Sequence, residues 1–105
     1  MSVSISVNLL AEAVLIGNEV RLTATLTDAA GDPVSAASLR CRVRRGIDGP
    51  EQEKSVVPTD NVGVAKFVPD AAGYWYFRWW TQGPPPIAKE GWVEILPSVF
   101  GADPA

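Results

Sequence analysis

The chain has 105 residues, of which 47% are apolar and 20% are charged, and its formal net charge at neutral pH is −3. This length corresponds to one domain, and this balance is typical of a folded globular protein, not of a disordered tail. A phosphate-binding domain normally carries a basic surplus, so the charge argues against nucleic acid as a partner.

The rarest residue types exclude several functional classes. The sequence contains one cysteine, Cys41, and no histidine. An intrachain disulfide and a thiolate metal cluster therefore cannot form. Without histidine the chain lacks the commonest general base, the commonest neutral metal ligand and every Ser-His or Cys-His nucleophile pair. We expect no enzymatic activity and no cofactor.

The sequence also shows no segment for membrane insertion or export. No apolar run approaches the roughly 20 residues that span a bilayer. The apolar stretch 9–16 is interrupted by Glu12 and follows no basic segment, so it does not resemble a signal peptide. We expect a protein made in the cytoplasm of its producing cell, with no membrane partner, and a lone free thiol is ordinary there.

Alternation of apolar and polar residues predicts strands along most of the chain. In chain order, the predicted strands cover residues 3–8, 20–27, 39–44, 54–57, 64–68, 73–82 and 90–96. The stretch 9–15 is interpreted as a strand or a connection, because it is too short for a stable helix on its own. We interpret residues 46–53 as a solvated connection, and we expect the three prolines at 84–86 to stiffen a hairpin loop.

Seven or eight short strands, with turn residues about every ten positions and no helical window, predict an all-β sandwich. The predicted domain covers residues 1–97. Residues 98–105 are expected to form a short flexible tail, because they lack periodicity and contain Gly and Pro. Aspartates fall in the predicted turns, where Asp caps the backbone, and this explains them better than a calcium site would. These aspartates are Asp28, Asp32, Asp60 and Asp70.

Two segments resemble immunoglobulin-like domains. The segment GNEVRLTA is similar to the second strand of the family, with Ala24 where a cysteine often lies. The segment DAAGYWYF is similar to the acidic-x-x-Gly-x-Tyr-x-Cys segment, with Trp75 at the position of the corner tyrosine and Phe77 at that of the second cysteine. The resemblance implies an immunoglobulin-like β-sandwich of about seven strands without the usual disulfide. It also implies an Ala24–Phe77 contact in place of the disulfide, and Cys41 near the place of the buried tryptophan.

A narrower resemblance covers the last third of the chain. The pieces Arg78-Trp79, Gly83-Pro84, Ala88-Lys89-Glu90-Gly91 and Val93-Glu94-Ile95 are similar to small immunoglobulin-like proteins encoded among the structural genes of tailed bacteriophages. Such proteins are virion components, including capsid decorations and neck or tail accessory proteins. The resemblance implies synthesis in the host cytoplasm, a location in the virion, and virion structural proteins as partners.

Strict alternation assigns the side chains of two aromatic-rich strands to opposite faces. With Trp75, Phe77 and Trp79 directed inward, their neighbours point outward, and a slip of one residue would exchange the two sets. In an immunoglobulin-like sandwich the strand 39–44 joins the same sheet. One outer face would then present eight residues that we predict to bind a partner: Arg40, Arg42, Arg44, Tyr74, Tyr76, Arg78, Trp80 and Trp92.

Two interpretations of this face compete. Arginines on a strand are usually solvated, and an Arg stem often covers a Trp ring. However, a soluble monomer rarely exposes a contiguous aromatic patch of roughly several hundred Å², and Tyr, Trp and Arg are enriched at binding hot spots. We therefore predict a non-enzymatic structural or interaction protein. It would dock on a protein partner or a symmetry mate through aromatic anchors, with arginines meeting the partner's carboxylates.

The alternative function is a carbohydrate- or cell-surface-binding module. In that case the rings of Tyr76, Trp80 and Trp92 would stack on sugars, with weak glycan binding as the result. A sugar site requires exposed and roughly coplanar rings, so the arrangement of these side chains distinguishes the two functions.

Overall fold

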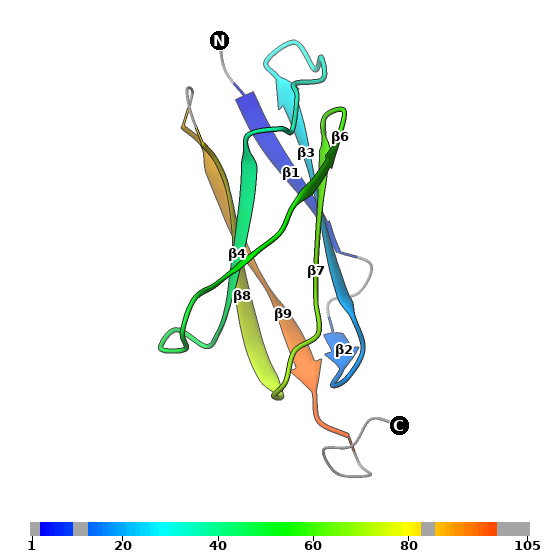
Figure 1. Ribbon diagram of the computed structural model, residues 1–105, viewed down its shortest axis with the longest axis vertical. Helices are drawn as coiled ribbons and strands as arrows, with labels where there is room; N and C mark the ends of the chain where they lie inside the picture. Colours follow the sequence, from blue (N-terminus) through cyan, green and yellow to red (C-terminus); the bar gives the residue numbers. More distant parts are fainter. Residues whose placement is uncertain (1–2, 10–12, 83–85, 99–105) are drawn as a thin grey trace.

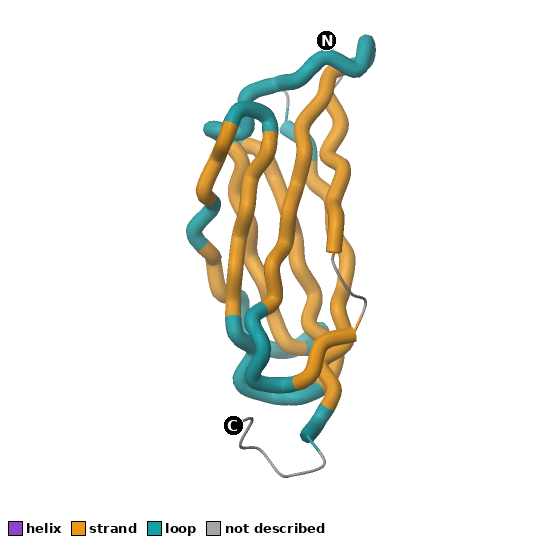
Figure 2. The backbone as a smooth tube through the Cα atoms, turned by 90° about the vertical axis from the view of Figure 1, so that its right-hand side faces the viewer, coloured by secondary structure: helices purple, strands orange, loops and turns teal. Residues whose placement is uncertain are grey.

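The computed structural model of the chain describes residues 3–9, 13–82 and 86–98. These residues form nine strands and no helix, and none of their segments is a helix that could cross a membrane. The strands run along the long axis of the molecule, and the loops gather at its two ends (Figure 2). The strands are β1 (Val3–Leu9), β2 (Ala13–Leu15), β3 (Val20–Asp28), β4 (Leu39–Arg45), β5 (Gln52–Lys54), β6 (Val57–Thr59), β7 (Val62–Phe67), β8 (Gly73–Thr81) and β9 (Ala88–Leu96).

The strands form two sheets that pack face to face (Figure 1). One sheet has four strands in the order β1-β3-β7-β6, and the other has five in the order β2-β9-β8-β4-β5. All neighbours are antiparallel except β2, which runs parallel to β9. The N-terminal region therefore contributes to both sheets, since β1 pairs with β3 and β2 pairs with β9.

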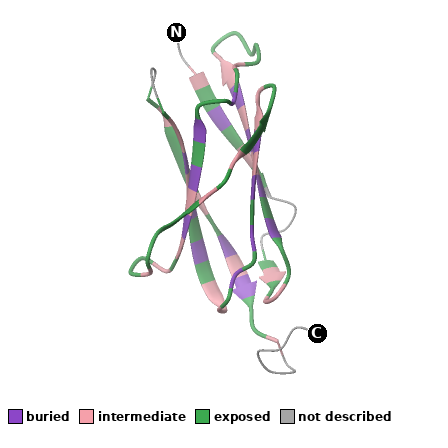
Figure 3. Cartoon of the chain, in the orientation of Figure 1, coloured by how far each residue is buried: buried purple, intermediate pink, exposed green. Residues whose placement is uncertain are grey.

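The core lies between the sheets and follows the alternation of the sequence. Along β3 every second residue from Val20 to Leu26 is buried, and buried and exposed positions alternate along the other long strands as well (Figure 3). Trp75, Phe77 and Trp79 are all buried on β8, so the predicted register of this strand is confirmed. Because alternation fixes the other set, the residues between them point away from the core.

The start of β8 has the geometry implied by the position of the corner tyrosine. The indole Nε1–H of Trp75 donates a hydrogen bond of 3.0 Å to the carbonyl oxygen of Ala71, four residues back. Its ring also packs against Phe67, with 5.5 Å between the ring centroids. A tryptophan thus supplies the side-chain-to-backbone bond that a tyrosine hydroxyl gives in this fold.

A glycine on β9 makes room for the aromatic core. Ala24 and Phe77 both lie in the buried core, at the two positions where the family often has cysteines. Phe77 faces Gly91 across the strands, and a Cβ atom added at Gly91 would come within 2.5 Å of the Phe77 ring. The ring therefore occupies the space above Gly91, and any side chain at that position would collide with it.

The segment predicted as a strand over 54–57 has a different structure. It divides into β5, in the five-stranded sheet, and β6, in the four-stranded sheet, and the chain crosses between the layers at residues 55–56 (Figure 1). Pro58 lies inside β6 instead of ending the strand. An edge strand tolerates proline because its outward N–H needs no partner within the sheet. This division, together with β2, raises the number of strands from about seven to nine.

Two other predictions concern residues that are largely outside the described ranges. Of the stiffening loop 84–86, only Pro86 is described, and of the C-terminal tail 98–105, only Ser98. The turn aspartates are within the described ranges, and Asp28 caps the backbone of its turn, as predicted. Its Oδ1 accepts hydrogen bonds from the backbone N–H groups of Ala30 at 3.0 Å and Asp32 at 2.9 Å.

Candidate functional site

All eight residues predicted to bind a partner lie on the outer face of the five-stranded sheet. The sheet register brings them together, because Arg40 pairs with Trp80, Arg42 with Arg78, Arg44 with Tyr76, and Tyr76 with Trp92. Their binding role stays a prediction. Their grouping on one surface follows directly from the burial of the residues that alternate with them.

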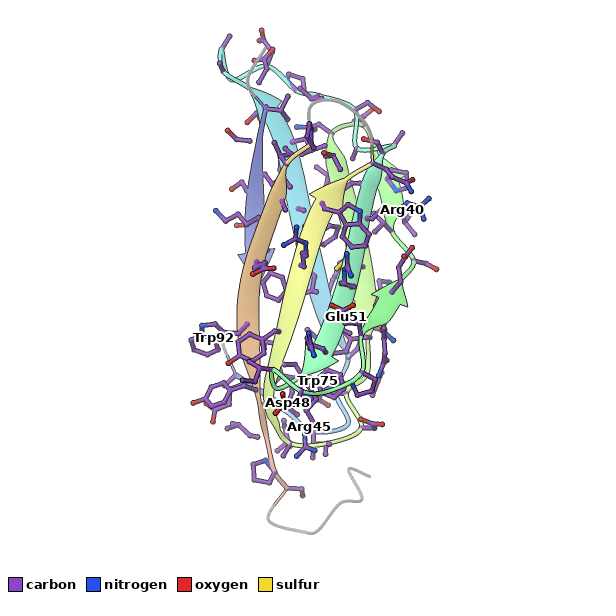
Figure 4. The ribbon with its side chains drawn as sticks, turned by 90° about the vertical axis from the view of Figure 1, so that its left-hand side faces the viewer. Arg40, Arg45, Asp48, Glu51, Trp75 and Trp92 are labelled. Atoms are coloured by element: carbon purple, nitrogen blue, oxygen red, sulfur yellow. The ribbon has the colours of Figure 1, made fainter. Side chains whose placement is uncertain are left out.

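The outer face has two parts with different chemistry. We call the first part the arginine end; it consists of Arg40, Arg42, Arg44, Arg78 and Trp80 together with Glu51, Glu53 and Glu90. We call the second part the aromatic end; it consists of Tyr74, Tyr76, Trp92, Leu96 and Leu15. In Figure 4, Arg40 and Glu51 lie to the right, in the region of β4, and Trp92 projects at the left from β9.

Carboxylates of the chain itself pair every arginine of the arginine end. The ion pairs, measured between the nearest nitrogen and oxygen atoms, are Arg40–Glu53 at 3.1 Å, Arg42–Glu51 at 3.0 Å, Arg44–Glu51 at 3.7 Å and Arg78–Glu90 at 2.7 Å. These side chains are 35–66% exposed, so each pair stabilises the fold by at most about 1 kcal/mol. The arginines expected to meet a partner's carboxylates are therefore already paired.

The glutamates also offset the repulsion between two arginines that lie opposite each other. Arg42 and Arg78 face each other directly across β4 and β8. Like charges at such positions destabilise a sheet. Glu51 bonds to Arg42, and Glu90 bonds to Arg78, so each guanidinium has a carboxylate beside it. The carboxylates thereby offset the repulsion between the two guanidinium groups.

Trp80 is covered by its neighbours. The guanidinium carbon of Arg42 lies 4.4 Å from the centroid of the Trp80 ring, a cation–π distance. Trp80 is consequently half-buried, while Arg40 is held beside it by two hydrogen bonds to the Gln82 side-chain oxygen, at 2.9 and 3.2 Å. The arginine end thus offers little uncovered aromatic surface. A shallow hollow of about 340 Å³ lies among its charged groups, bordered by Tyr76 and Ile47.

The three glutamates were missed by the sequence analysis. The solvated connection expected at 46–53 instead leads into β5, where Glu53 pairs across the strands with Arg42. The signal was present, because Glu51 and Glu53 alternate with a period of two, as the arginines do. Opposite charges in two such runs separated by one turn favour a hairpin with cross-strand ion pairs. Glu90 gives no comparable signal, because it faces a single arginine, Arg78, and the two do not belong to alternating runs of opposite charge.

The aromatic end is uncovered by the described chain. Tyr74, Trp92 and Leu15 are 45–50% exposed, and Tyr76 and Leu96 are 37% and 39% exposed. The rings of Tyr74 and Trp92 meet edge to face, with 5.4 Å between centroids and 80° between planes. Leu15 was not predicted, because the stretch 9–15 had two possible structures. It reaches this patch through β2, where it pairs with Leu96.

One acidic residue lies within the aromatic end. Glu94 is on the outward side of β9, where it pairs across the strands with Tyr74 and with Ala13 of β2. It is half-buried by these neighbours. In contrast to the glutamates of the arginine end, Glu94 forms no ion pair with any of the described residues. The aromatic end therefore combines five apolar side chains with one carboxylate that is not neutralised.

The described ranges contain neither a cluster of metal ligands nor an activated cysteine thiol. No three His, Cys, Asp or Glu side chains there gather as metal ligands. The thiol of Cys41 is buried on the inner side of β4, and desolvation by burial raises its pKa from 9.0 to about 12. A thiol with this pKa is protonated at neutral pH and is a poor nucleophile.

Comparisons with known proteins identify the fold. No protein-family model matches the chain, and no curated protein matches it in sequence. A crystal structure of a DUF4785 family protein from Legionella pneumophila is similar, with a TM-score of 0.66 and 13% identity. The match covers 92% of this chain but only 29% of that protein. The Lin-41 filamin domain is similar with a TM-score of 0.64 and 16% identity, over 86% of this chain and 91% of that domain.

These identities are low enough that the likeness concerns the fold alone. Two sheets, nine strands among the described residues, a bonded corner residue at Trp75 and no disulfide agree with it. The chain is an immunoglobulin-like β-sandwich.

Proposed function

We propose that the chain is a non-enzymatic interaction module that binds a protein partner through its aromatic end. The observation that carries the proposal is a patch of five apolar side chains, from β2, β8 and β9, that the described chain leaves uncovered. Contiguous apolar patches on soluble domains mark interaction sites, and Tyr and Trp are the residues that most often dominate binding energy.

The arginine end has the properties of a polar rim beside this patch. Its arginines are neutralised by Glu51, Glu53 and Glu90, so a partner's carboxylate would have to displace a bonded glutamate. Such an exchange gains little free energy, because one ion pair replaces another. Rims of this kind exclude water and set orientation, while the apolar centre supplies affinity.

Glu94 indicates the chemistry of the partner. An apolar group that covers Tyr74 and Trp92 would also bury the Glu94 carboxylate, and a buried charge without a counter-ion is costly. The partner therefore carries a Lys or Arg next to its apolar anchor. Arginine suits this position best, because its planar guanidinium can stack on an aromatic ring and bond to a carboxylate at the same time.

The partner that we propose is a structural protein of a tailed-phage virion, and the virion is the proposed location. The support is the resemblance of the last third of the sequence to small immunoglobulin-like virion proteins. Residues Tyr74, Trp92 and Leu96 of the aromatic end lie in or near this part of the chain. Repeated copies on a symmetric shell would convert individually weak contacts into tight attachment.

The geometry favours a protein partner over a glycan. A sugar platform needs exposed rings in roughly one plane, but the planes of Tyr74 and Trp92 are 80° apart. Of the rings predicted to stack on sugars, Trp92 is the one that meets Tyr74 edge to face, and Trp80 lies under the guanidinium of Arg42. An edge-to-face pair presents a ridge and a notch, which a shaped apolar side chain fills better than a flat sugar does.

The experiment is selection of a displayed random-peptide library on the immobilised protein. We expect the selected peptides to contain an apolar residue beside Arg or Lys. Their affinity should fall about 30-fold on Trp92→Ala, since truncation of a hot-spot aromatic costs about 2 kcal/mol. The matched control is Arg42→Ala, which removes a large side chain from the arginine end and should change the affinity only a few-fold.

Two results would overturn the proposal. One is a set of selected peptides that bind Trp92→Ala as tightly as the wild-type protein. The other is binding on a glycan array that is lost with Trp92→Ala while the peptide selection fails, which would assign the aromatic end to sugars. Circular dichroism of both variants verifies that they are folded.

A further inference from the structure

Four strands form the edges of the two sheets in the described part of the chain, and three of them are protected against pairing. The edge strands are β1 and β6 in one sheet and β2 and β5 in the other. β2, β5 and β6 have three residues each, β5 carries Glu53 and Lys54, and β6 contains Pro58. Short length, charge and proline are the usual devices that prevent an edge from pairing with another chain.

β1 has none of these devices. It has seven residues, and the sequence carries no charged side chain from Ser2 to Leu10 and no proline there. Among the described strands, β1 pairs only with β3, so the backbone groups on its other side have no strand beside them. A long, uncharged edge strand of this kind is a template for one further strand.

The side chains of β1 are also incompletely covered. Val3, Ile5 and Val7 point toward the core, but only Ile5 is buried, and the two valines are half-buried although they pack against the core. On the outward side Ser4 and Ser6 are exposed. An additional strand at this edge would cover the half-buried valines and would place small polar groups beside the serines.

We propose that β1 pairs antiparallel with β1 of a second copy of this chain, so that two four-stranded sheets become one continuous sheet. A two-fold axis across β1 places serines and Asn8 opposite each other on the outer face, and Val3, Ile5 and Val7 opposite each other on the inner face. A shift of the two strands by two residues keeps every side chain on its own face. Polar residues then still meet on the outer face, and apolar residues on the inner face. No like charges meet, because the strand has none.

The other edges do not suit a second copy. Antiparallel self-pairing of β5 about its centre would bring Glu53 opposite its own counterpart, which is destabilising. In β6, Pro58 removes one of only three backbone donors. β2 carries no charge or proline, but it has only three residues and offers too short an edge, so among the described edges β1 alone is both long and self-complementary.

This contact would leave the aromatic end free. β1 belongs to the four-stranded sheet, and the aromatic end belongs to the outer face of the five-stranded sheet. The pair would present two aromatic ends and would bind a repetitive surface with the gain of bivalency. Pairing of a single strand buries less surface than a stable dimer interface, so we expect a weak, concentration-dependent dimer.

The first test is light scattering on the full chain across a wide range of concentration. The wild-type mass should rise toward that of a dimer, and Ser4→Lys/Ser6→Lys should remain monomeric, because lysines would then face each other across the two-fold axis. The matched control is Thr23→Lys/Thr25→Lys, which adds the same charge to the same face on the neighbouring strand β3 and should dimerise as the wild type does.

A charge-reversal experiment makes the test specific. An equimolar mixture of Ser4→Lys/Ser6→Lys with Ser4→Glu/Ser6→Glu should recover the dimer, because opposite charges then meet. Hydrogen exchange on the unmodified protein needs no variant, and amide protection in β1 should increase with protein concentration while that of β5 and β6 does not.

The outcomes separate this inference from the proposed function. A wild-type protein that stays monomeric at every concentration, or a dimer that survives in Ser4→Lys/Ser6→Lys, would overturn the β1 contact. A dimer lost in Trp92→Ala but retained in Ser4→Lys/Ser6→Lys would also overturn it and would place self-association at the aromatic end. Loss of peptide binding in Trp92→Ala with an intact dimer supports both ideas independently.

Discussion

The arginine end and the aromatic end occupy one face of one sheet, but they satisfy their side chains in opposite ways. On β8 the first two of four successive outward residues, Tyr74 and Tyr76, belong to the aromatic end. The next two, Arg78 and Trp80, belong to the arginine end. Arg78 has a carboxylate at 2.7 Å, and Trp80 has a guanidinium over its ring. Tyr74 meets the exposed ring of Trp92 edge to face and pairs across the strands with Glu94.

This difference shows that a cluster of binding-type residues is not by itself a binding surface. Arginine and tryptophan are hot-spot residues, but at the arginine end each arginine is ion-paired with a glutamate and the Trp80 ring lies under Arg42. At the aromatic end the described neighbours leave the five side chains 37–50% exposed, and Glu94 has no counter-ion among the described residues. The neighbours across the strands, and not the residue types, decide which part of the face is available to a partner.

The largest expected effect comes from a substitution at Gly91, because both ends have residues on the part of β9 that contains it. Gly91 lies between Glu90 of the arginine end and Trp92 of the aromatic end, and the Phe77 ring occupies the space above it. We expect Gly91→Val to lower the free energy of unfolding by about 2–3 kcal/mol, because the buried ring cannot move aside without strain. Urea denaturation measures this effect.

The control for this prediction is Ala88→Val at the exposed start of the same strand, which should change the stability by less than about 0.5 kcal/mol. An unchanged urea midpoint in Gly91→Val would mean that the Phe77 ring can relocate. The close approach of ring and backbone would then not be what holds β8 and β9 in place beneath the two ends.

A second prediction tests the interior beneath the arginine end. Cys41 lies between Arg40 and Arg42 on β4 but points inward, and burial raises the pKa of its thiol to about 12. Between pH 9 and 12 the unfolded chain loses this proton and the folded chain keeps it. The titration of this thiol should therefore lower the free energy of unfolding by about 1.4 kcal/mol per pH unit in this range. Below pH 9 the thiol is protonated in both states, so it should add no pH dependence to the free energy of unfolding.

The Cys41→Ala variant isolates this effect, since all other titrating groups are common to both proteins. We expect the stability difference between the wild-type protein and the variant to shrink as the pH rises above 9. Parallel stability curves would show that the thiol is accessible to water in the folded state, and rapid thiol labelling of the native protein would show the same.

Much of this face follows from local sequence patterns. The strict alternation from Trp75 to Trp79 shows which residues point outward. The resemblance of residues 70–77 to immunoglobulin-like domains placed Trp75 at the corner position, where its indole bonds to Ala71. These features depend on residues close together in the chain. Periodicity and a short sequence resemblance can therefore predict them without knowledge of the rest of the fold.

The parts that were not predicted depend on contacts between distant segments. The chain crosses between the sheets at residues 55–56, a short stretch without Gly or Pro, so the sequence analysis predicted one strand where the structure has β5 and β6. The covering of Trp80 by Arg42 and the pairing of Arg78 with Glu90 are cross-strand contacts. A list of outward residues does not reveal which of them neutralise each other.

The smallest expected change in stability comes from removing the carboxylates that distinguish the two ends. In Glu51→Gln/Glu53→Gln, Arg40, Arg42 and Arg44 lose their ion-pair partners. Because these pairs are exposed, the free energy of unfolding should fall by less than about 1 kcal/mol. The arginine end should then become a cationic surface, and the variant should elute from a heparin column at a higher salt concentration than the wild-type protein.

The matched control is Glu19→Gln/Asp70→Asn, which removes the same charge at exposed positions away from this face. If both double variants are retained equally on heparin, net charge alone governs the binding, and the internal pairing of the arginines has no influence on it. If only Glu51→Gln/Glu53→Gln is retained more strongly, the two glutamates are what prevent the arginine end from attracting anionic partners. The difference between the two ends would then rest on two side chains of the β4–β5 hairpin.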